Sequence, residues 1–117
     1  VIGATSFYNI SPKHRTLYIG YTWMDPDCWG KGINPIIKKL MLAYAFDHLQ
    51  MRRVAFCIDS ENLRSRRAVE KLGVPFEGIL KKHFIRPDGT DRDSAIYALT
   101  DDLWSEKLHL MQTRSIV

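Results

Sequence analysis

The residue pattern with the clearest chemical meaning is a pair of glycines between a predicted strand and a predicted helix. Gly30 and Gly32 flank Lys31, and Pro35 suits the first helical turn because its missing N–H costs nothing there. A glycine-rich entry to a helix lets backbone N–H groups converge on a bound anion, with the helix dipole behind them. The turn therefore predicts a pyrophosphate site, although such glycines can also serve only to allow a tight bend.

This turn matches neither of the two common nucleotide motifs. It lacks the third glycine of a dinucleotide-binding fold, and it lacks the Gly-Lys-Ser/Thr ending of a P-loop. The glycines alone therefore leave the identity of the anion open.

A second group of polar residues begins the next predicted helix. Asn62 and Ser65 stand three residues apart, in line with the apolar Ala68, Val69 and Leu72. Asn62 can also simply cap the helix, and Ser65 can bond back to a carbonyl of the preceding turn. Because both polar groups follow successive strands, they are expected to meet at one edge of the sheet. This juxtaposition favours one shared binding site.

The elements that must position these groups follow the order ββ-α-β-α-ββ-α. That order predicts an α/β fold around a mixed sheet, with residues 1–117 forming a single domain. The apolar run 54–58 is typical of an interior strand that helices cover on at least one side. Strands are expected at residues 2–10, 16–23, 54–58, 76–86 and 92–100. One helix is expected at residues 33–49, a second after residues 59–62 that ends at residue 72, and a third after residues 101–102.

The helix over residues 33–49 is expected to be mostly buried. Its apolar residues recur at helical spacing and form a wide stripe. The residues expected to be exposed are Lys38, Lys39, Asp47 and His48.

Two further glycines are expected to end elements. Gly73 stands where a helix needs a left-handed C-terminal cap, and Asp88-Gly89 is a turn signal between two strands.

Composition limits the classes of function. The formal net charge of +4 favours anionic partners, but the positive charges are dispersed and no RNA-binding aromatic motif is present, which argues against nucleic acid. No apolar run reaches the ~18 residues of a membrane span. Cys28 and Cys57 have no paired spacing of the kind metal sites use, so we expect no metal and a reducing, cytoplasmic setting.

Several motifs together carry a family resemblance, and they lie in the right order over almost the whole chain. They are Ile19-Gly20-Tyr21, Trp29-Gly30-Lys31-Gly32, Asn62-x-x-Ser65, Glu70-Lys71-Leu72-Gly73 and Gly78. At these residues the chain resembles the GNAT superfamily of N-acetyltransferases, specifically the RimJ/RimL-like branch that acetylates ribosomal-protein N-termini. The resemblance implies that the domain is N-terminally incomplete, because relatives carry a first strand and two helices ahead of the position of Val1.

The resemblance further implies that acetyl-CoA lies in a V-shaped gap between two parallel strands, which end near Trp23 and Ile58. Unpaired strand edges at such a gap offer backbone groups to the pantetheine amides. In this model Asn62 bonds the pantetheine, and the backbone of Trp23 and Met24 faces the thioester. The N–H groups expected to hold the pyrophosphate are those of Trp29, Gly30, Lys31, Gly32, Ile33 and Asn34.

The implied activity is acetyl transfer to a primary amine, either a protein N-terminus or a small amine, by direct attack on the thioester. Ser65 becomes the expected proton donor to the thiolate, because Val69 stands where many relatives carry a tyrosine. The N–H of Trp23 or Met24 would stabilise the oxyanion. No base is evident; the open candidates are Tyr97, His83, His14, Glu77 and Asp93.

Departures from the family pattern leave a second function open. Asp27 replaces a Gln or Arg near the phosphate, so binding there would rest on backbone groups, with Lys31, Arg66 and Arg67 as further candidates. Together with Val69, this departure is compatible with a non-catalytic CoA-binding or regulatory module. Assembly as a homodimer is also left open.

Overall fold

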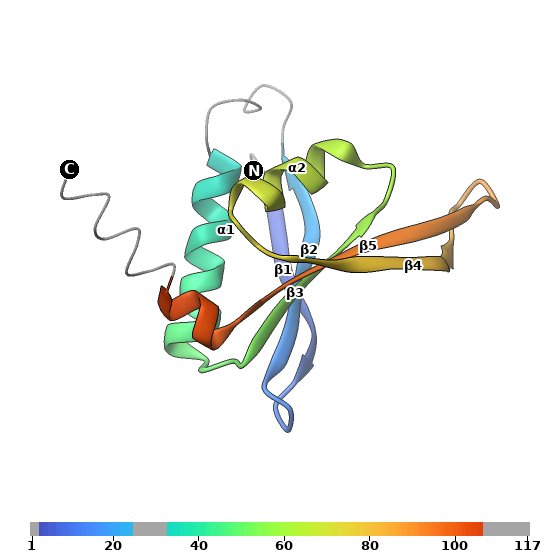
Figure 1. Ribbon diagram of the computed structural model, residues 1–117. Helices are drawn as coiled ribbons and strands as arrows, with labels where there is room; N and C mark the ends of the chain where they lie inside the picture. The colour runs from blue at the N-terminus through green and yellow to red at the C-terminus, as the bar shows by residue number, and fades with distance from the viewer. Residues whose placement is uncertain (1–2, 25–32, 107–117) are drawn as a thin grey trace.

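The computed structural model describes residues 3–24 and 33–106, which form one five-stranded sheet with helices packed on it (Figure 1). The strand order is β1-β2-β3-β5-β4; β2 and β3 pair in parallel and the other neighbours are antiparallel. The predicted mixed α/β fold and its element order are confirmed. The strands are β1 (Gly3–Ser11), β2 (Thr16–Met24), β3 (Arg53–Asp59), β4 (Phe76–Ile85) and β5 (Asp91–Thr100), and the helices are α1 (Ile33–Ala43), η2 (Tyr44–His48) and α2 (Leu63–Lys71).

Both α1 and α2 pack on the same face of the sheet. Phe56 of β3 lies directly opposite Tyr97 of β5, so the two rings share a face. The Lys38 ammonium of α1 lies 5.5 Å from the Phe56 ring centre, and Arg66 of α2 bonds the Tyr97 hydroxyl. This face carries the core, whose largest fully buried members are Tyr97, Phe56, Leu17, Ile19, Leu99, Val54 and Val69.

The burial predicted for α1 is wrong at three positions. Ile36 and Leu40 are 59% and 65% exposed, whereas Lys38 is only 6% exposed. Lys38 packs its aliphatic stem into the interface and places its ammonium over an aromatic face, which lets a charged residue occupy a core-facing position. Burial lowers the pKa of the Lys38 amine.

The predicted helix over residues 33–49 changes type near its end. From Tyr44 to His48 the chain forms a π-helical turn, in which the Leu49 N–H donates to the Tyr44 carbonyl at 2.9 Å. The wider turn buries Ala45 and Phe46.

Residues 101–106, within the last predicted helix, are helical. Trp104 stacks on Phe46 at 5.5 Å between ring centres, and its indole N–H donates to Asp47 at 3.0 Å. These contacts fasten this helix against η2. None of the helices in residues 33–106 is long and apolar enough to cross a membrane.

Both glycine predictions are confirmed. Gly73 follows α2 with φ of 80°, and Gly89 has φ of 87° in the turn between β4 and β5. The Asp88 carboxylate accepts from the backbone N–H and the hydroxyl of Thr90, which closes that turn.

Gly20 of β2 is required by a close approach of an aromatic ring. A Cβ added at Gly20 would lie 2.6 Å from Cε1 of Tyr8 on the neighbouring strand. Tyr8 is itself held against Tyr18, at 5.3 Å between ring centres.

We expect Gly20→Ala to lower the free energy of unfolding by about 1–3 kcal/mol, because the Tyr8 ring must move to admit the methyl group. Denaturant unfolding of the single variants and of the Tyr8→Ala/Gly20→Ala double variant measures this coupling. In the Tyr8→Ala background the Gly20→Ala change should cost much less; an equal cost in both backgrounds would contradict the steric explanation.

Candidate functional site

The central feature of the site is the early end of pairing between the two parallel strands. Thr16, Leu17 and Tyr18 of β2 pair with residues 53–55 of β3. Beyond Tyr18 and Ala55 no further pair joins the two strands in the part of the chain that the structure describes, although β2 runs on to Met24 and β3 to Asp59. Each strand remains paired to its outer neighbour, so the sheet opens only between them. The splayed strands predicted from the sequence are confirmed.

The backbone of β3 presents hydrogen-bonding groups to this gap. Along a strand, the N–H and C=O groups of one residue face one neighbouring strand, and those of the next residue face the strand on the other side. The Arg53 N–H donates to the Arg15 carbonyl just before β2, whereas the Ser60 N–H donates to Asp93 of β5. By this alternation the backbone groups of Cys57 face β2, at the level where pairing with β2 has ended. A ligand in the gap can therefore be held as an added strand would be.

Asn62 and Ser65 begin α2 beside the C-terminal end of β3. The Asn62 Oδ1 accepts from the Ser65 N–H at 3.2 Å, so Asn62 is the N-cap of the helix. This is the capping interpretation that the sequence analysis gave beside the ligand-binding one. The Asn62 amide N–H groups and the half-buried Ser65 hydroxyl have no hydrogen-bond partner among the described residues. Capping thus occupies the Asn62 oxygen and leaves its donors for a ligand.

The loop that carries Asn62 is fixed by Arg86 from the end of β4. The Arg86 guanidinium donates to both oxygens of Asp59, at 2.8 and 2.9 Å, and to Glu61 at 2.9 Å. Asp59 also accepts the Glu61 N–H, and its carbonyl accepts the Asn62 N–H. This bidentate pairing, led by the hydrogen bond from Arg86, lowers the pKa of Asp59 from 3.8 to about 2. Nothing in the sequence signalled this contact, because 27 positions separate its partners.

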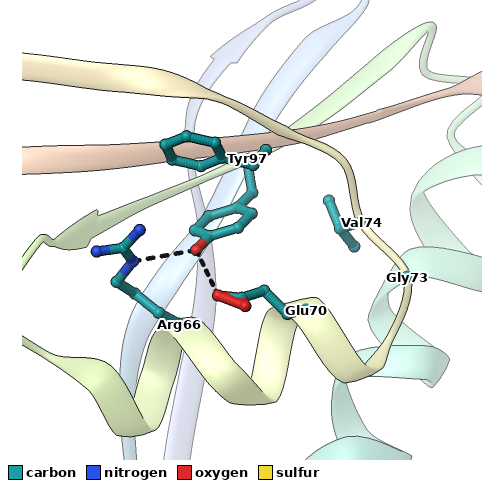
Figure 2. Close-up of a pocket in the computed structure, with 6 residues that line it drawn as sticks. Arg66, Glu70, Gly73, Val74 and Tyr97 are labelled. Carbon is teal, nitrogen blue, oxygen red and sulfur yellow. Dashed lines mark hydrogen bonds between the residues drawn. The ribbon is translucent and has the colours of Figure 1, made fainter.

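A second set of contacts fixes α2 on the sheet (Figure 2). Arg66 donates its Nε–H to the Tyr97 hydroxyl at 3.1 Å, and Tyr97 donates to Glu70 at 2.9 Å. Arg66 also donates to the Ser60 carbonyl at 3.0 Å. Burial raises the pKa of the Tyr97 hydroxyl, which therefore stays protonated as a donor. Nε and Nη1 of Arg66 are thus engaged within the protein, which argues against Arg66 as the phosphate ligand considered from the sequence.

These residues line an open pocket of about 470 Å³. It lies over β4 and β5, whereas the gap lies between β2 and β3 on the other side of β3. Its polar side chains are hydrogen-bonded to one another. The pocket is therefore better explained as the packing interface between α2 and the sheet than as the ligand site. Its lining residues are Arg66, Glu70, Gly73, Val74, Phe76 and Tyr97.

Four further predicted site residues lie in elements that the structure describes. Trp23 and Met24 end β2, where they pair with Ala4 and Gly3 of β1. Ile33 and Asn34 begin α1. The turn formed by Trp29, Gly30, Lys31 and Gly32 lies outside the described residues. Residues 3–24 and 33–106 hold no group of three or more His, Cys, Asp or Glu side chains arranged to bind a metal ion.

A family model for the acetyltransferase (GNAT) domain matches residues 1–75, which is more than half of the chain. The chain belongs to the GNAT acetyltransferase family. The resemblance predicted from the motifs is therefore confirmed.

Individual relatives agree with this assignment. The uncharacterized N-acetyltransferase YoaA of Bacillus subtilis (strain 168) is 28% identical over 99 residues, which are 85% of this chain and 55% of YoaA. The ribosomal-protein-serine acetyltransferase of Escherichia coli (strain K12) is 30% identical over 98 residues, 84% of this chain and 54% of that protein. This GNAT chain therefore spans about half the length of the curated relatives it matches.

A solved structure gives the same answer for the fold. The crystal structure of a GCN5-related N-acetyltransferase from Brucella melitensis superposes with a TM-score of 0.85 at 31% identity. The match covers 90% of this chain and 47% of that one. The GNAT sheet of this chain is thus shared with an experimentally determined relative.

We expect the Asp59–Arg86 contact to make the stability of this GNAT domain depend on acid. Because folding lowers the pKa of Asp59, the ionised carboxylate stabilises the folded state. This contribution is fully present at a pH above the unfolded-state pKa of ~3.9, and it is lost as the pH falls through the folded-state pKa of about 2. Asp59→Asn should remove this part of the dependence, on the order of 1 kcal/mol because the side chain is 25% exposed. Urea unfolding between pH 6 and pH 2 measures it; equal pH slopes for both proteins would refute the expectation.

Proposed function

We propose that this chain is the acetyl-CoA-binding part of an N-acetyltransferase that transfers an acetyl group to a primary amine, on a protein N-terminus or a small molecule. The observation that supports this most directly is the gap between β2 and β3, with the free donors of Asn62 at its α2 side. The family assignment supports acetyl-CoA as the donor. Membership in the family does not define the acceptor, so the amine is part of the proposal.

The residues present fit an acyl-CoA. The Cys57 N–H and the Asn62 amide N–H groups are donors of the kind that pantetheine amides need, whereas the Cys57 carbonyl already accepts from Arg92 at 3.3 Å. The end of β2 at Trp23 and Met24 is the proposed neighbour of the thioester, and the N–H of Trp23 or Met24 would stabilise the oxyanion. The backbone of Trp29, Gly30, Lys31, Gly32, Ile33 and Asn34 is proposed to hold the pyrophosphate.

The reaction needs a neutral amine and a stabilised leaving group. The amine nitrogen attacks the thioester carbonyl, a C–N bond forms, and the C–S bond breaks to release CoA thiolate. Ser65 is proposed to protonate or hydrogen-bond that sulfur, and its hydroxyl has no hydrogen-bond partner among the described residues. Val69, which stands at the family's tyrosine position, is 1% exposed in the core and cannot take this role.

We expect Asn62→Asp to weaken CoA binding about fivefold while leaving the stability nearly unchanged. Aspartate keeps the cap oxygen for the Ser65 N–H but loses the amide donors, and a hydrogen bond of this kind contributes about 1 kcal/mol. Isothermal calorimetry with CoA and thermal unfolding measure the two effects. Asn62→Ser, which also caps, controls for the added charge; parent affinity in both variants would argue against Asn62 as a ligand.

Ser65→Ala is expected to leave CoA affinity unchanged and to slow amine-dependent thiol release about tenfold. The effect is modest because a thiolate with a pKa near ~8.5 already leaves fairly readily. Single-turnover measurements of released thiol test it, and release at the parent rate would remove Ser65 as the acid. CoA binding with no thiol release for any amine, in the parent chain, would instead favour a regulatory module.

A further inference from the structure

A bulge in β4 places a histidine where a regular strand would not. Between the pairs Leu80↔Ser94 and Phe84↔Arg92, β4 advances four residues while β5 advances two. Lys82 within the bulge has φ of 48°, in the left-handed region that non-glycine residues rarely adopt. Bulges of this kind re-aim side chains and are common beside active sites.

Asp93 of β5 stabilises the bulge. Its carboxylate accepts the Lys82 N–H at 2.8 Å and contacts the Lys81 ammonium at 3.4 Å. The bond from the Lys82 N–H is the first cause of a lowered pKa at Asp93. The unusual backbone at Lys82 is therefore compensated by a charge-assisted hydrogen bond, which makes the position of the following residue, His83, a defined one.

His83 of β4 contacts side chains from β5 and from β3, the strand beyond it. Its Nδ1 lies 2.9 Å from the hydroxyl of Ser94, which is fully buried, and 3.8 Å from the Cys57 sulfur. Arg92 donates its Nε–H to the same Ser94 oxygen at 3.1 Å. In the tautomer that carries its proton on Nδ1, His83 donates to the serine oxygen, which also accepts from Arg92, and the lone pair of Nε2 is directed away from the cluster. Nε2 has no partner among the described residues.

This cluster lies at the proposed acyl site but on the opposite sheet face from α1 and α2. Side chains alternate along β3, so Cys57 points away from the face that carries Phe56. The Cys57 backbone faces the gap, because Cys57 lies four residues after Arg53, whose N–H points to the β2 side, and backbone groups alternate along the strand. His83, in contact with the Cys57 side chain, therefore stands beside the mouth of the gap. An acyl arm that enters from the α2 side would present its reactive end to this mouth.

We propose that His83 is the catalytic base that takes the proton from the acceptor amine, with Ser94 as its positioning residue. As the amine nitrogen bonds the acetyl carbon and the C–S bond breaks, the N–H proton passes to Nε2 and the thiolate leaves. Imidazole suits this step because its neutral form carries one ring nitrogen with a lone pair that can accept a proton. The charged and titratable groups that face the ring are Arg92 of β5 and Cys57 of β3, with Lys81, Lys82 and Asp93 around the bulge. The inference rests on the proposed function and identifies the base that the sequence left open.

The first test needs no turnover. In NMR spectra the ring C2–H resonance of His83, assigned by its loss in His83→Gln, should shift when CoA alone is added. His14, which lies in the exposed turn between β1 and β2, supplies the control resonance and should not shift. A His83 resonance that ignores saturating CoA would overturn the placement of the ring at the gap.

The second test compares kinetics. His83→Gln should keep the parent affinity for acetyl-CoA but lower kcat/KM for the amine by about 10²-fold near neutral pH. The loss should shrink at high pH, where more of the amine is already neutral, and His14→Ala should match the parent throughout. A parent-like pH profile in His83→Gln, or an acetyl group trapped on Cys57, would overturn the inference while leaving the proposed function standing. A parent chain that binds no acetyl-CoA would overturn both.

Discussion

The loss of pairing between β2 and β3 after Tyr18 and Ala55 is the constraint on which the rest of the site depends. A parallel pair that ends early leaves backbone donors and acceptors without their usual partners, which costs free energy unless a ligand or water satisfies them. The outer pairs, β1 with β2 and β3 with β5, hold the two strands while they diverge. The gap is therefore a stable feature of the sheet rather than a local defect.

The side chains around the gap are fixed by contacts that come from distant parts of the chain. Arg86 holds the loop after β3 through Asp59 and Glu61, and Arg66 and Glu70 hold α2 through the Tyr97 hydroxyl. Both arrangements join α2 or its entry loop to the β4–β5 hairpin. The residues that would bind the acyl donor are thus oriented by residues that do not touch it.

How much the sequence predicted follows from the range of each interaction. Local signals located the strands, the cap at Asn62 and the turns at Gly73 and Gly89, because each depends on neighbours within a few residues. Periodicity found α1 but misjudged its burial: a hydrophobicity pattern cannot foresee that Lys38 turns inward over Phe56 while Leu40 stays outside. The Arg86 contact and the His83 cluster were missed because they require the register of separate strands, including a bulge that no motif marks.

The bulge in β4 has a consequence beyond the residue it orients. In the part of the chain that the structure describes, β4 is an edge strand of the sheet and carries the exposed side chains of Leu80, Phe84 and Ile85, a combination that would otherwise invite another chain to pair along it. The extra residues interrupt the regular row of backbone groups, and two lysines sit at the interruption. The same irregularity that aims an imidazole at the gap therefore also protects the sheet from edge-to-edge aggregation.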